Sequence, residues 1–212
     1  PCGLATSDNL GQAFLNALDC DRTSAFGSIV GFNRPVDLLT ANTLRAEAKS
    51  GIKIEAIIAP SYTPKALKAL ARVKSRRILE IGALSANTKI MQLRHMVGGL
   101  LVQDRDAKQI TVEDLQFVTQ RKPSEPEIQS LLFAWKACKH VKSNAILLAK
   151  GTQSIGIGAG QMSRVDSTLI AIRKAGERIS GSVLASDAYF PFSDGVEAAG
   201  QAGVIAIIQP GG

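Results

Sequence analysis

The sequence predicts an α/β protein, in which helices alternate with strands and pack on layered sheets. Short apolar runs typical of buried strands alternate with segments of helical periodicity along the 212 residues. One order of elements also occurs twice. The first occurrence consists of NRPVD, a helix, the strand and loop IEAIIAPSY, a Thr-Pro helix and the strand RRILEIG. The second consists of MSRVD, a helix, the strand and loop SVLASDAYF, a helix and the strand VIAIIQP. Identity between the two runs is low, and their shared order hints at an internal duplication.

In the first half of the chain, capping residues and proline mark the helices. The expected helices are one capped by Ser7 or Asp8, with Leu10, Phe14 and Leu18 on its apolar face, one from Asp37 or Thr40 to Lys49, and one beginning at Thr63-Pro64. The expected strands are Ile29–Phe32, Ile54–Ala59 and Arg76–Gly82, and the stretch Met91–Asp104 is expected to be extended.

The segment RKPSEPE is expected to be a hinge that divides the chain into units 1–120 and 121–212. Ser124 and Glu127 then form a capping box, and the helix that follows places Trp135 on a core-facing stripe. A helix from about Met162 to Ala175 is expected to bury Val165, Leu169 and Ile172. The remaining expected elements are strands at Ala145–Ala149, Ser154–Ile157, Ser182–Asp187 and Val204–Pro210, and a helix over Gly195–Ala202.

Composition narrows the class of protein. The chain carries a net charge of +7, which suits anionic partners such as phosphates, polycarboxylates or nucleic acid. The densest basic run, ARVKSRR, is interpreted as a solvated helix end. The three cysteines form no disulfide or zinc framework, and no apolar run is long enough for a membrane span. A cytoplasmic protein is expected.

The chain lacks an initiator Met and stops directly after a predicted strand, so we expect a piece of a longer protein.

The stretch GIGAGQMSRVDST lies where a dinucleotide fingerprint would begin a helix. Gly156 and Gly158 fit the pattern G-x-G-x-x-G/A, but its third position is Gln161, which argues against a nicotinamide site. A glycine turn before a helix still offers backbone N–H groups to an anion, and Arg164 adds a cation with fork-shaped geometry. The alternative is a tight turn with a surface arginine.

Two further stretches carry candidate ligand contacts. DAYFPF follows a predicted strand and gathers Tyr189, Phe190 and Phe192, which can sandwich a flat heterocycle, unless they form a minor core cluster. Asp187 and Asp194 flank them. In KHVKSN, Asn144 could orient a substrate carbonyl or amine.

The two histidines, His95 and His140, are interpreted as structural. Zinc is not expected, because the deaminase motifs H-x-E and P-C-x-x-C are absent.

Three long motifs together resemble one family. KHVKSNAILLAKGTQSIGIGAGQMSRVDS, ASDAYFPFSDGVEAAGQAGVIAIIQPGG and SAFGSIVGFNRPVD are similar to the formyltransferase half of the bifunctional AICAR transformylase/IMP cyclohydrolase family, and the likeness runs along essentially all 212 residues. The stretch HMVGGLLVQDRD is more similar to bacterial members. The resemblance implies two three-layer α/β/α units of cytidine deaminase-like fold without zinc. It also implies a homodimer with active sites at the subunit interface.

The activity that the resemblance implies is transfer of a formyl group from 10-formyltetrahydrofolate to the 5-amino group of AICAR, which gives FAICAR for IMP synthesis. IMP cyclohydrolase activity would reside in a further domain. A Lys-His pair upstream of Pro1 would supply the general base, and His140 is not that histidine. We therefore expect this chain to be inactive alone. The alternatives are a nucleotide-binding oxidoreductase, which would bind NADH, and a non-enzymatic domain that binds anions or nucleic acid.

The resemblance also assigns residues to the site. Asn144 corresponds to the catalytic asparagine beside the AICAR amine, and Asp187 to a ligand of a monovalent cation, usually potassium. The substrate-binding residues that it implies are Phe26, Gly27, Glu55, Arg164, Val165, Tyr189, Phe192 and Asp194. Glu55 stands where some members have Asp, and Tyr189 where some have Phe. Neither NAD, nucleic acid nor a membrane is an expected partner.

Overall fold

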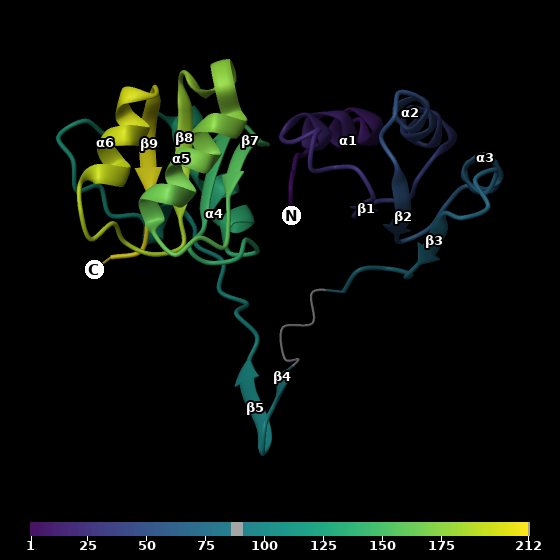
Figure 1. Cartoon of the computed structure of the whole chain (residues 1–212), viewed down its shortest axis with the longest axis horizontal. Coiled ribbons are helices and arrows are strands. Elements are labelled where there is room, and N and C mark those ends of the chain that lie inside the picture. Colours follow the sequence, from purple (N-terminus) through teal and green to yellow (C-terminus); the bar gives the residue numbers. More distant parts are fainter. Residues whose placement is uncertain (86–90, 212) are drawn as a thin grey trace.

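The computed structural model describes residues 1–85 and 91–211, which form an α/β architecture (Figure 1). Its α-helices are α1 (Leu10–Asp19), α2 (Leu38–Lys49), α3 (Pro64–Leu70), α4 (Glu125–Cys138), α5 (Arg164–Ala175) and α6 (Asp194–Gln201). Its strands are β1 (Ser28–Gly31), β2 (Ile54–Ala59), β3 (Arg77–Glu80), β4 (Met91–Met96), β5 (Gly99–Asp104), β6 (Ile146–Lys150), β7 (Gln153–Gly158), β8 (Ser182–Ser186) and β9 (Val204–Ile208). The predicted alternation of helices and strands is confirmed.

The second sheet has the order β7-β6-β8-β9 and is buried on both faces. β6 is antiparallel to β7 and to β8, whereas β8 and β9 are parallel. Alternate side chains of β6 point to opposite faces, so Leu147 packs with Leu131 and Cys138 of α4. Leu148 packs in the other cluster with Ala171 of α5. Helices therefore cover both faces of this sheet, which accounts for the near-continuous apolar sequence of its central strands.

The first sheet has the order β1-β2-β3, with all strands parallel. Val30, Ile57 and Ile78 lie in one row across it and face the core formed with α1, α2 and α3. The neighbouring row is Gly31, Ile58 and Leu79, which points to the other face. Leu79 is exposed there, so this face carries apolar side chains that no described helix covers.

Two glycines of β7 explain how α5 packs on the second sheet. Gly156 and Gly158 lie inside the strand and are buried, so the expected glycine turn before the helix is wrong for both. A Cβ on Gly158 would lie 1.8 Å from the Ser167 carbonyl oxygen, and one on Gly156 would lie 2.2 Å from that of Ala171. The glycines thus let the helix backbone approach the strand, and only Gly160, with φ of 70°, makes the turn.

The same close approach overturns the predicted buried face of α5. Ser167, Thr168, Ala171 and Ala175 face the sheet, whereas Leu169 is 52% exposed and Val165 and Ile172 are only partly buried. Small side chains are needed where two backbones nearly touch. Apolar periodicity takes large apolar side chains as the buried ones, so it predicted the wrong buried face of α5.

Other local predictions are confirmed or corrected by single contacts. Asp37, Thr63 and the Ser124–Glu127 capping box begin their helices as expected. Asn9, rather than Ser7 or Asp8, caps α1 by accepting from the Gln12 N–H. The basic run ARVKSRR was expected to be exposed to solvent, which is wrong for Arg76. This residue is 8% exposed and donates to the carbonyls of Ile54 and Leu70. Trp135 packs against the α4 core while partly exposed.

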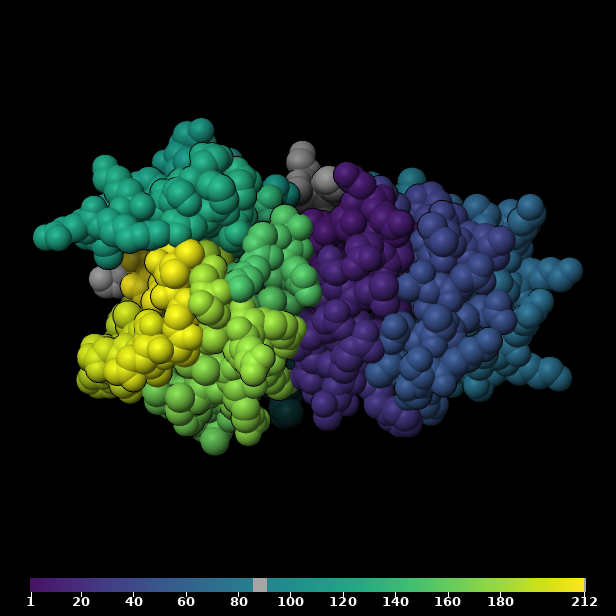
Figure 2. Space-filling model, turned by 90° about the horizontal axis from the view of Figure 1, so that it is seen from above, coloured from purple at the N-terminus to yellow at the C-terminus, as the bar shows by residue number. Residues whose placement is uncertain are grey.

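The N-terminal segment joins the two sheets. Ser154 of β7 donates its N–H to the Leu4 carbonyl, and Thr6 donates to the Thr152 carbonyl, both at 2.9 Å. Lys174 of α5 pairs with Asp21, and Arg178 donates to the Asp19 carbonyl. Figure 2 shows the purple N-terminal residues lying against the green residues of this region.

The predicted extended stretch is an antiparallel hairpin of β4 and β5, which pairs Met91 with Asp104 and Met96 with Gly99. It projects away from both sheets (Figure 1). Within residues 1–85 and 91–211, no helix combines the length and the apolar character needed to cross a membrane.

Candidate functional site

Three of the predicted site residues meet at one edge of the second sheet. Asn144 precedes β6 and Asp187 follows β8; because these strands are antiparallel, both lie at the same edge. Arg164 is the first residue of α5 and reaches across this edge. Crevices beyond the carboxyl ends of strands are where α/β sheets bind ligands, so the location suits a site.

Arg164 is the centre of a largely buried polar cluster. Its Nη1 donates to Asp187 Oδ1 at 2.6 Å and to Ser186 Oγ at 2.8 Å, and its Nη2 donates to Asn144 Oδ1 at 2.9 Å. The Arg164 side chain is 11% exposed and that of Asp187 is 19% exposed. A guanidinium has five donors, so two N–H groups of Arg164 remain beyond these three contacts.

Asn144 is fixed by the loop before α5. Its Nδ2 donates to the Gln161 carbonyl at 2.9 Å and to the Met162 carbonyl at 3.0 Å, which uses both hydrogens. Ser167 Oγ donates to the Asn144 carbonyl. The side-chain oxygen accepts from Arg164 and has a second lone pair, which is the one part of this amide that can accept from a ligand.

Asp187 is held as a carboxylate. Burial acts to raise its pKa, but hydrogen bonds from Ser143, from the Arg164 guanidinium and from the Ala145 N–H together place the pKa below its usual value. The Ala145 N–H donates to Oδ1 at 3.0 Å. The acid is thus ionised at neutral pH and compensates the charge of Arg164.

This pKa predicts a pH dependence of stability. A carboxylate whose pKa is lowered by folding stabilises the protein above its unfolded pKa of about 4, and this contribution is lost as pH falls through the lower folded value. We expect the difference in unfolding free energy between the wild type and Asp187→Asn to narrow below about pH 4. Urea unfolding followed by Trp135 fluorescence measures it. A difference that stays constant from pH 7 to pH 3 would contradict the assignment, and Asp8→Asn is an exposed control.

The aromatic stretch divides between core and surface. Phe190 packs in the core of α5 and α6, and a Cβ on Gly195 would lie 2.8 Å from its ring. Tyr189 is 50% exposed and Phe192 is 74% exposed, so both rings are available to a ligand. Asp194 begins α6 in an exposed position and accepts from the Gly195 N–H. Tyr189, Phe192 and Asp194 thus follow β8 in exposed positions, while Phe190 is structural.

The other predicted residues lie on the first sheet. Phe26 and Gly27 precede β1, and Glu55 is the second residue of β2, so they lie at the amino ends of those strands. Lys53 links them, since its Nζ pairs with Glu55 Oε1 and lies 6.0 Å from the centre of the Phe26 ring. Val165 is partly buried beside Arg164 on α5. The Phe26 group and the Arg164 cluster therefore stand on different sheets of the chain.

Sequence reasoning missed Ser186, Lys53 and the backbone carbonyls of the loop. Ser186 is fully buried at the end of β8, accepts from Arg164 and donates to the Ala188 carbonyl. A serine at the end of an apolar strand could have signalled it, because a buried hydroxyl needs partners. The position of Lys53 gave no such signal. Cys138 belongs to the core: burial raises the pKa of its thiol to about 12.

The implied cation fits this site poorly. Asp187 Oδ1 already accepts from a guanidinium and a backbone N–H, so its charge is compensated without a metal. In the part of the chain that the structure describes, no three His, Cys, Asp or Glu side chains gather as metal ligands.

The fold and the cluster together define an α/β protein with a polar site at one edge of a mixed sheet. Comparison with known proteins narrows this class. The chain belongs to the AICARFT/IMPCHase bienzyme family, whose model matches residues 1–174.

Curated relatives match along the whole chain. It is 50% identical over 212 residues to the bifunctional purine biosynthesis protein PurH of Oceanobacillus iheyensis and to that of Anoxybacillus flavithermus, and 49% identical to that of Bacillus subtilis. All of this chain is covered in each comparison, but only 41%, 40% and 40% of the respective relatives. The chain thus spans about two fifths of the length of these relatives.

Proposed function

We propose that the chain forms part of a phosphoribosylaminoimidazolecarboxamide formyltransferase. It would transfer a formyl group from 10-formyltetrahydrofolate to the 5-amino group of AICAR and give FAICAR in purine biosynthesis. The observation that carries the proposal is the match to proteins named as bifunctional purine biosynthesis proteins, which extends over every candidate residue at about half identity. Because the chain spans 41% of such a relative, IMP cyclohydrolase activity is proposed for the longer protein only.

The cluster suits the needs of this reaction. The AICAR amine is weakly nucleophilic because its lone pair is delocalised into the imidazole-carboxamide, so the amine must be oriented and lose a proton as it attacks. The free lone pair of Asn144 Oδ1 can accept from that amine. The formyl oxygen gains negative charge, which an unused N–H of Arg164 can stabilise. Asp187 keeps Arg164 in place while leaving those donors available.

The rings and acids around the cluster would bind the two substrates. Tyr189 and Phe192 offer exposed aromatic faces to the folate, with Asp194 facing the pterin N–H donors. Phe26, Gly27 and Glu55 would contact the nucleotide from the first sheet, and Val165 would line the pocket beside Arg164. Because the Phe26 group and the Arg164 cluster stand on different sheets, we propose a homodimer in which sites form between copies.

The finer fold also belongs to the proposal. We propose two cytidine deaminase-like units without zinc, over residues 1–120 and 121–212. The equivalent orders α2-β2-α3-β3 and α5-β8-α6-β9, each ending in a parallel strand pair, support the duplication. We also propose a cytoplasmic location. The potassium ion is not part of the proposal, because Arg164 already compensates the charge of Asp187.

Asn144→Ala tests the proposed chemistry. In the protein at the full length of its relatives, we expect kcat for formyl transfer to fall about a hundredfold, as loss of a positioned catalytic amide can cause. The assay measures tetrahydrofolate released from 10-formyltetrahydrofolate when AICAR is present. His140→Ala is the control, because His140 is exposed nearby and should leave kcat unchanged. A fall in kcat of less than about threefold would show that Asn144 has no catalytic role. If the folded wild type released no tetrahydrofolate in the presence of AICAR, the proposed function would be wrong.

A further inference from the structure

Arg76 is the one buried charge in the described part of the chain. At 8% exposure, it is the only Asp, Glu, Lys or Arg among residues 1–85 and 91–211 that is buried. None of the ion pairs that these residues form includes it. Burying an ionised group without a counter-charge is strongly unfavourable, and buried charges in proteins are almost always paired. Arg76 therefore lacks the partner that its burial requires.

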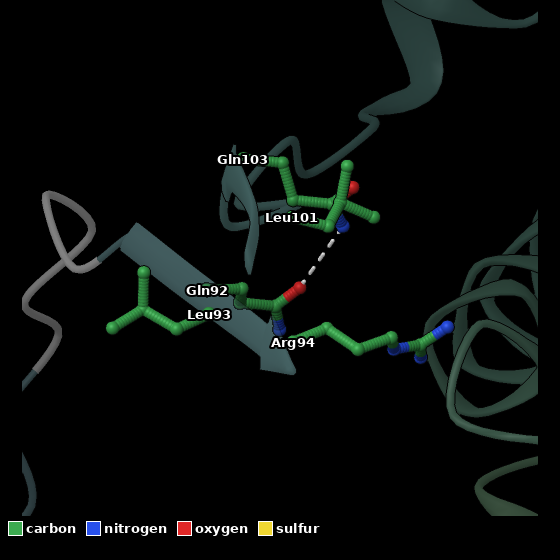
Figure 3. A pocket seen from close by; sticks show the side chains of 5 residues that line it. All are labelled: Gln92, Leu93, Arg94, Leu101 and Gln103. Carbon is green, nitrogen blue, oxygen red and sulfur yellow. Dashed lines mark hydrogen bonds between the residues drawn. The ribbon is translucent and has the colours of Figure 1, made fainter. Parts of the chain in front are cut away.

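Other arginines of the chain show the two usual solutions. Arg164 is paired with the Asp187 carboxylate. Arg94 of β4 is exposed, and Figure 3 shows its side chain extending away from the other labelled side chains of the hairpin. Arg76 has neither a carboxylate partner nor a solvated position.

The contacts that Arg76 makes use two of its five N–H groups. Nε donates to the Ile54 carbonyl at 3.3 Å and Nη1 to the Leu70 carbonyl at 3.4 Å, both longer than is usual for such bonds. Leu70 is the last residue of α3, so Arg76 caps the carbonyl end of that helix. Capping by neutral carbonyls leaves three donors and the positive charge unmatched.

The free end of the guanidinium reaches the surface. Nη2 of Arg76 has no partner among the described residues. The only fully buried side-chain nitrogen or oxygen without a partner in that part of the chain is Ser182 Oγ, so Nη2 is in contact with solvent. A small ligand can reach this atom, whereas a side chain that is 8% exposed offers too little surface to a macromolecule.

A second guanidinium lies near the first. Burial, and after it the positive charge of Arg45 on α2, lowers the pKa of Arg76 below its usual value. Arg45 is partly buried and donates to Asn42 at 3.4 Å, and no ion pair among the described residues includes it. Two like charges that are held together repel, unless an anion lies between them. The two arginines thus have the charge and the free donors of an anion site.

The surrounding sequence is basic. Residues 38–77 contain nine Lys and Arg against two Glu, which equals the net charge of +7 on the whole chain. Both acids are already paired, Glu47 with Arg22 and Glu55 with Lys53. The run ARVKSRR therefore surrounds Arg76 with positive potential, which attracts anions from solution.

We propose that Arg45 and Arg76 bind a phosphate group, either inorganic phosphate or the phosphate of a small phosphomonoester. Phosphate carries nearly two negative charges at neutral pH and several acceptor oxygens, which match two guanidinium forks. The site lies between α2, the end of α3 and the first residue of β2. It belongs to the first sheet, whereas the Arg164 cluster belongs to the second, so the proposal does not depend on formyl transfer.

Equilibrium dialysis of the chain against radiolabelled inorganic phosphate, at constant ionic strength in sodium chloride, tests the site. We expect a phosphate to bind with a Kd of about 1 mM or lower. Arg45→Ala should weaken this binding about tenfold or more, because it removes one of the two cations at a position that is only partly buried. Arg72→Ala is the matched control, an exposed arginine in the same basic run, and should leave the Kd within about twofold.

Stability supplies a second readout, which separates phosphate binding from helix capping. If Arg76 only capped α3, Arg76→Met would lower the urea midpoint equally with and without phosphate. A buried charge without its anion is destabilising, so we expect Arg76→Met to be as stable as the wild type in phosphate-free buffer. At about 10 mM phosphate, only the wild type should gain stability.

Two results would overturn the proposal: a wild type that binds no phosphate in this dialysis, or an Arg45→Ala chain that binds it as tightly as the wild type. Arg45→Ala decides alone if Arg76→Met does not fold. Adenosine 5′-monophosphate distinguishes the two sources of the phosphate group. A Kd for this nucleotide about tenfold below that for phosphate would identify a phosphomonoester, and otherwise the ligand is inorganic phosphate. Failure of the proposed formyl transfer would leave each of these results unchanged.

Discussion

Gly158→Ala is expected to destabilise the chain by about 3 kcal/mol or more, because a backbone contact cannot relax as a flexible side chain can. The added Cβ would lie 1.8 Å from the Ser167 carbonyl oxygen and 2.6 Å from its carbonyl carbon. The α5 helix must then move away from β7, and Arg164 at its first turn moves with it. The substitution therefore disturbs both the core between α5 and the second sheet and the polar cluster around Arg164.

Urea unfolding followed by Trp135 fluorescence measures this loss, and Gly200→Ala is the matched control. Gly200 lies in α6 with nothing within 4 Å of an added Cβ and without a positive φ. Alanine there should stabilise the helix by about 0.5–1 kcal/mol, since it restricts the unfolded chain. A loss below about 1 kcal/mol at Gly158 would mean that the helix and the strand are less tightly apposed than described.

Arg164→Ala is expected to lower stability by about 3 kcal/mol and to abolish formyl transfer in the full-length protein. The change leaves the Asp187 carboxylate largely buried without its cation, and Asn144 Oδ1 and Ser186 Oγ each lose a donor. Arg164→Lys keeps the charge but cannot reproduce the planar fork that reaches three acceptors. We expect Lys to restore part of the stability and little of the activity.

Arg173→Ala provides the control for a lost arginine in the same helix. Arg173 is exposed in the last turn of α5, so its removal should change stability by less than about 0.5 kcal/mol and leave activity intact. Equal losses from Arg164→Ala and Arg173→Ala would show that helix charge, rather than the cluster, stabilises the chain. Full activity in a stable Arg164→Ala protein would contradict the role proposed for its free donors.

Much of the fold was predictable because local chemistry and tertiary packing agree along most of the chain. Ile54–Ala59 is apolar between turn residues, and Thr63-Pro64 satisfies the first donors of a helix, so each formed as predicted. The prediction failed where packing overrides pattern. Leu169 has the spacing of a core residue, yet the glycines of β7 draw small residues of α5 inward and leave it exposed.

The candidate site was predictable in part. Asn144, Arg164 and Asp187 meet at one edge as predicted sites, but the hydrogen bonds by which they satisfy one another depend on tertiary contacts that no local pattern shows. Ser186 was missed because its role arises from strand pairing, which brings β8 beside β6. Pairing across about forty residues is a tertiary event that no local pattern encodes.

The contacts between the N-terminal segment and the region of β7 imply an order of folding. Leu4 and Ser154 are 150 residues apart, and Asp19 and Arg178 are 159 apart. Closing loops of this length carries a large entropic penalty, which contacts within each sheet do not face to the same degree. The two sheets should therefore collapse first as separate nuclei, and α1 should dock on β7 last. On the ribosome, where the chain emerges at about 5–20 residues per second, the N-terminal segment must wait roughly 8–30 s for β7 to be synthesised.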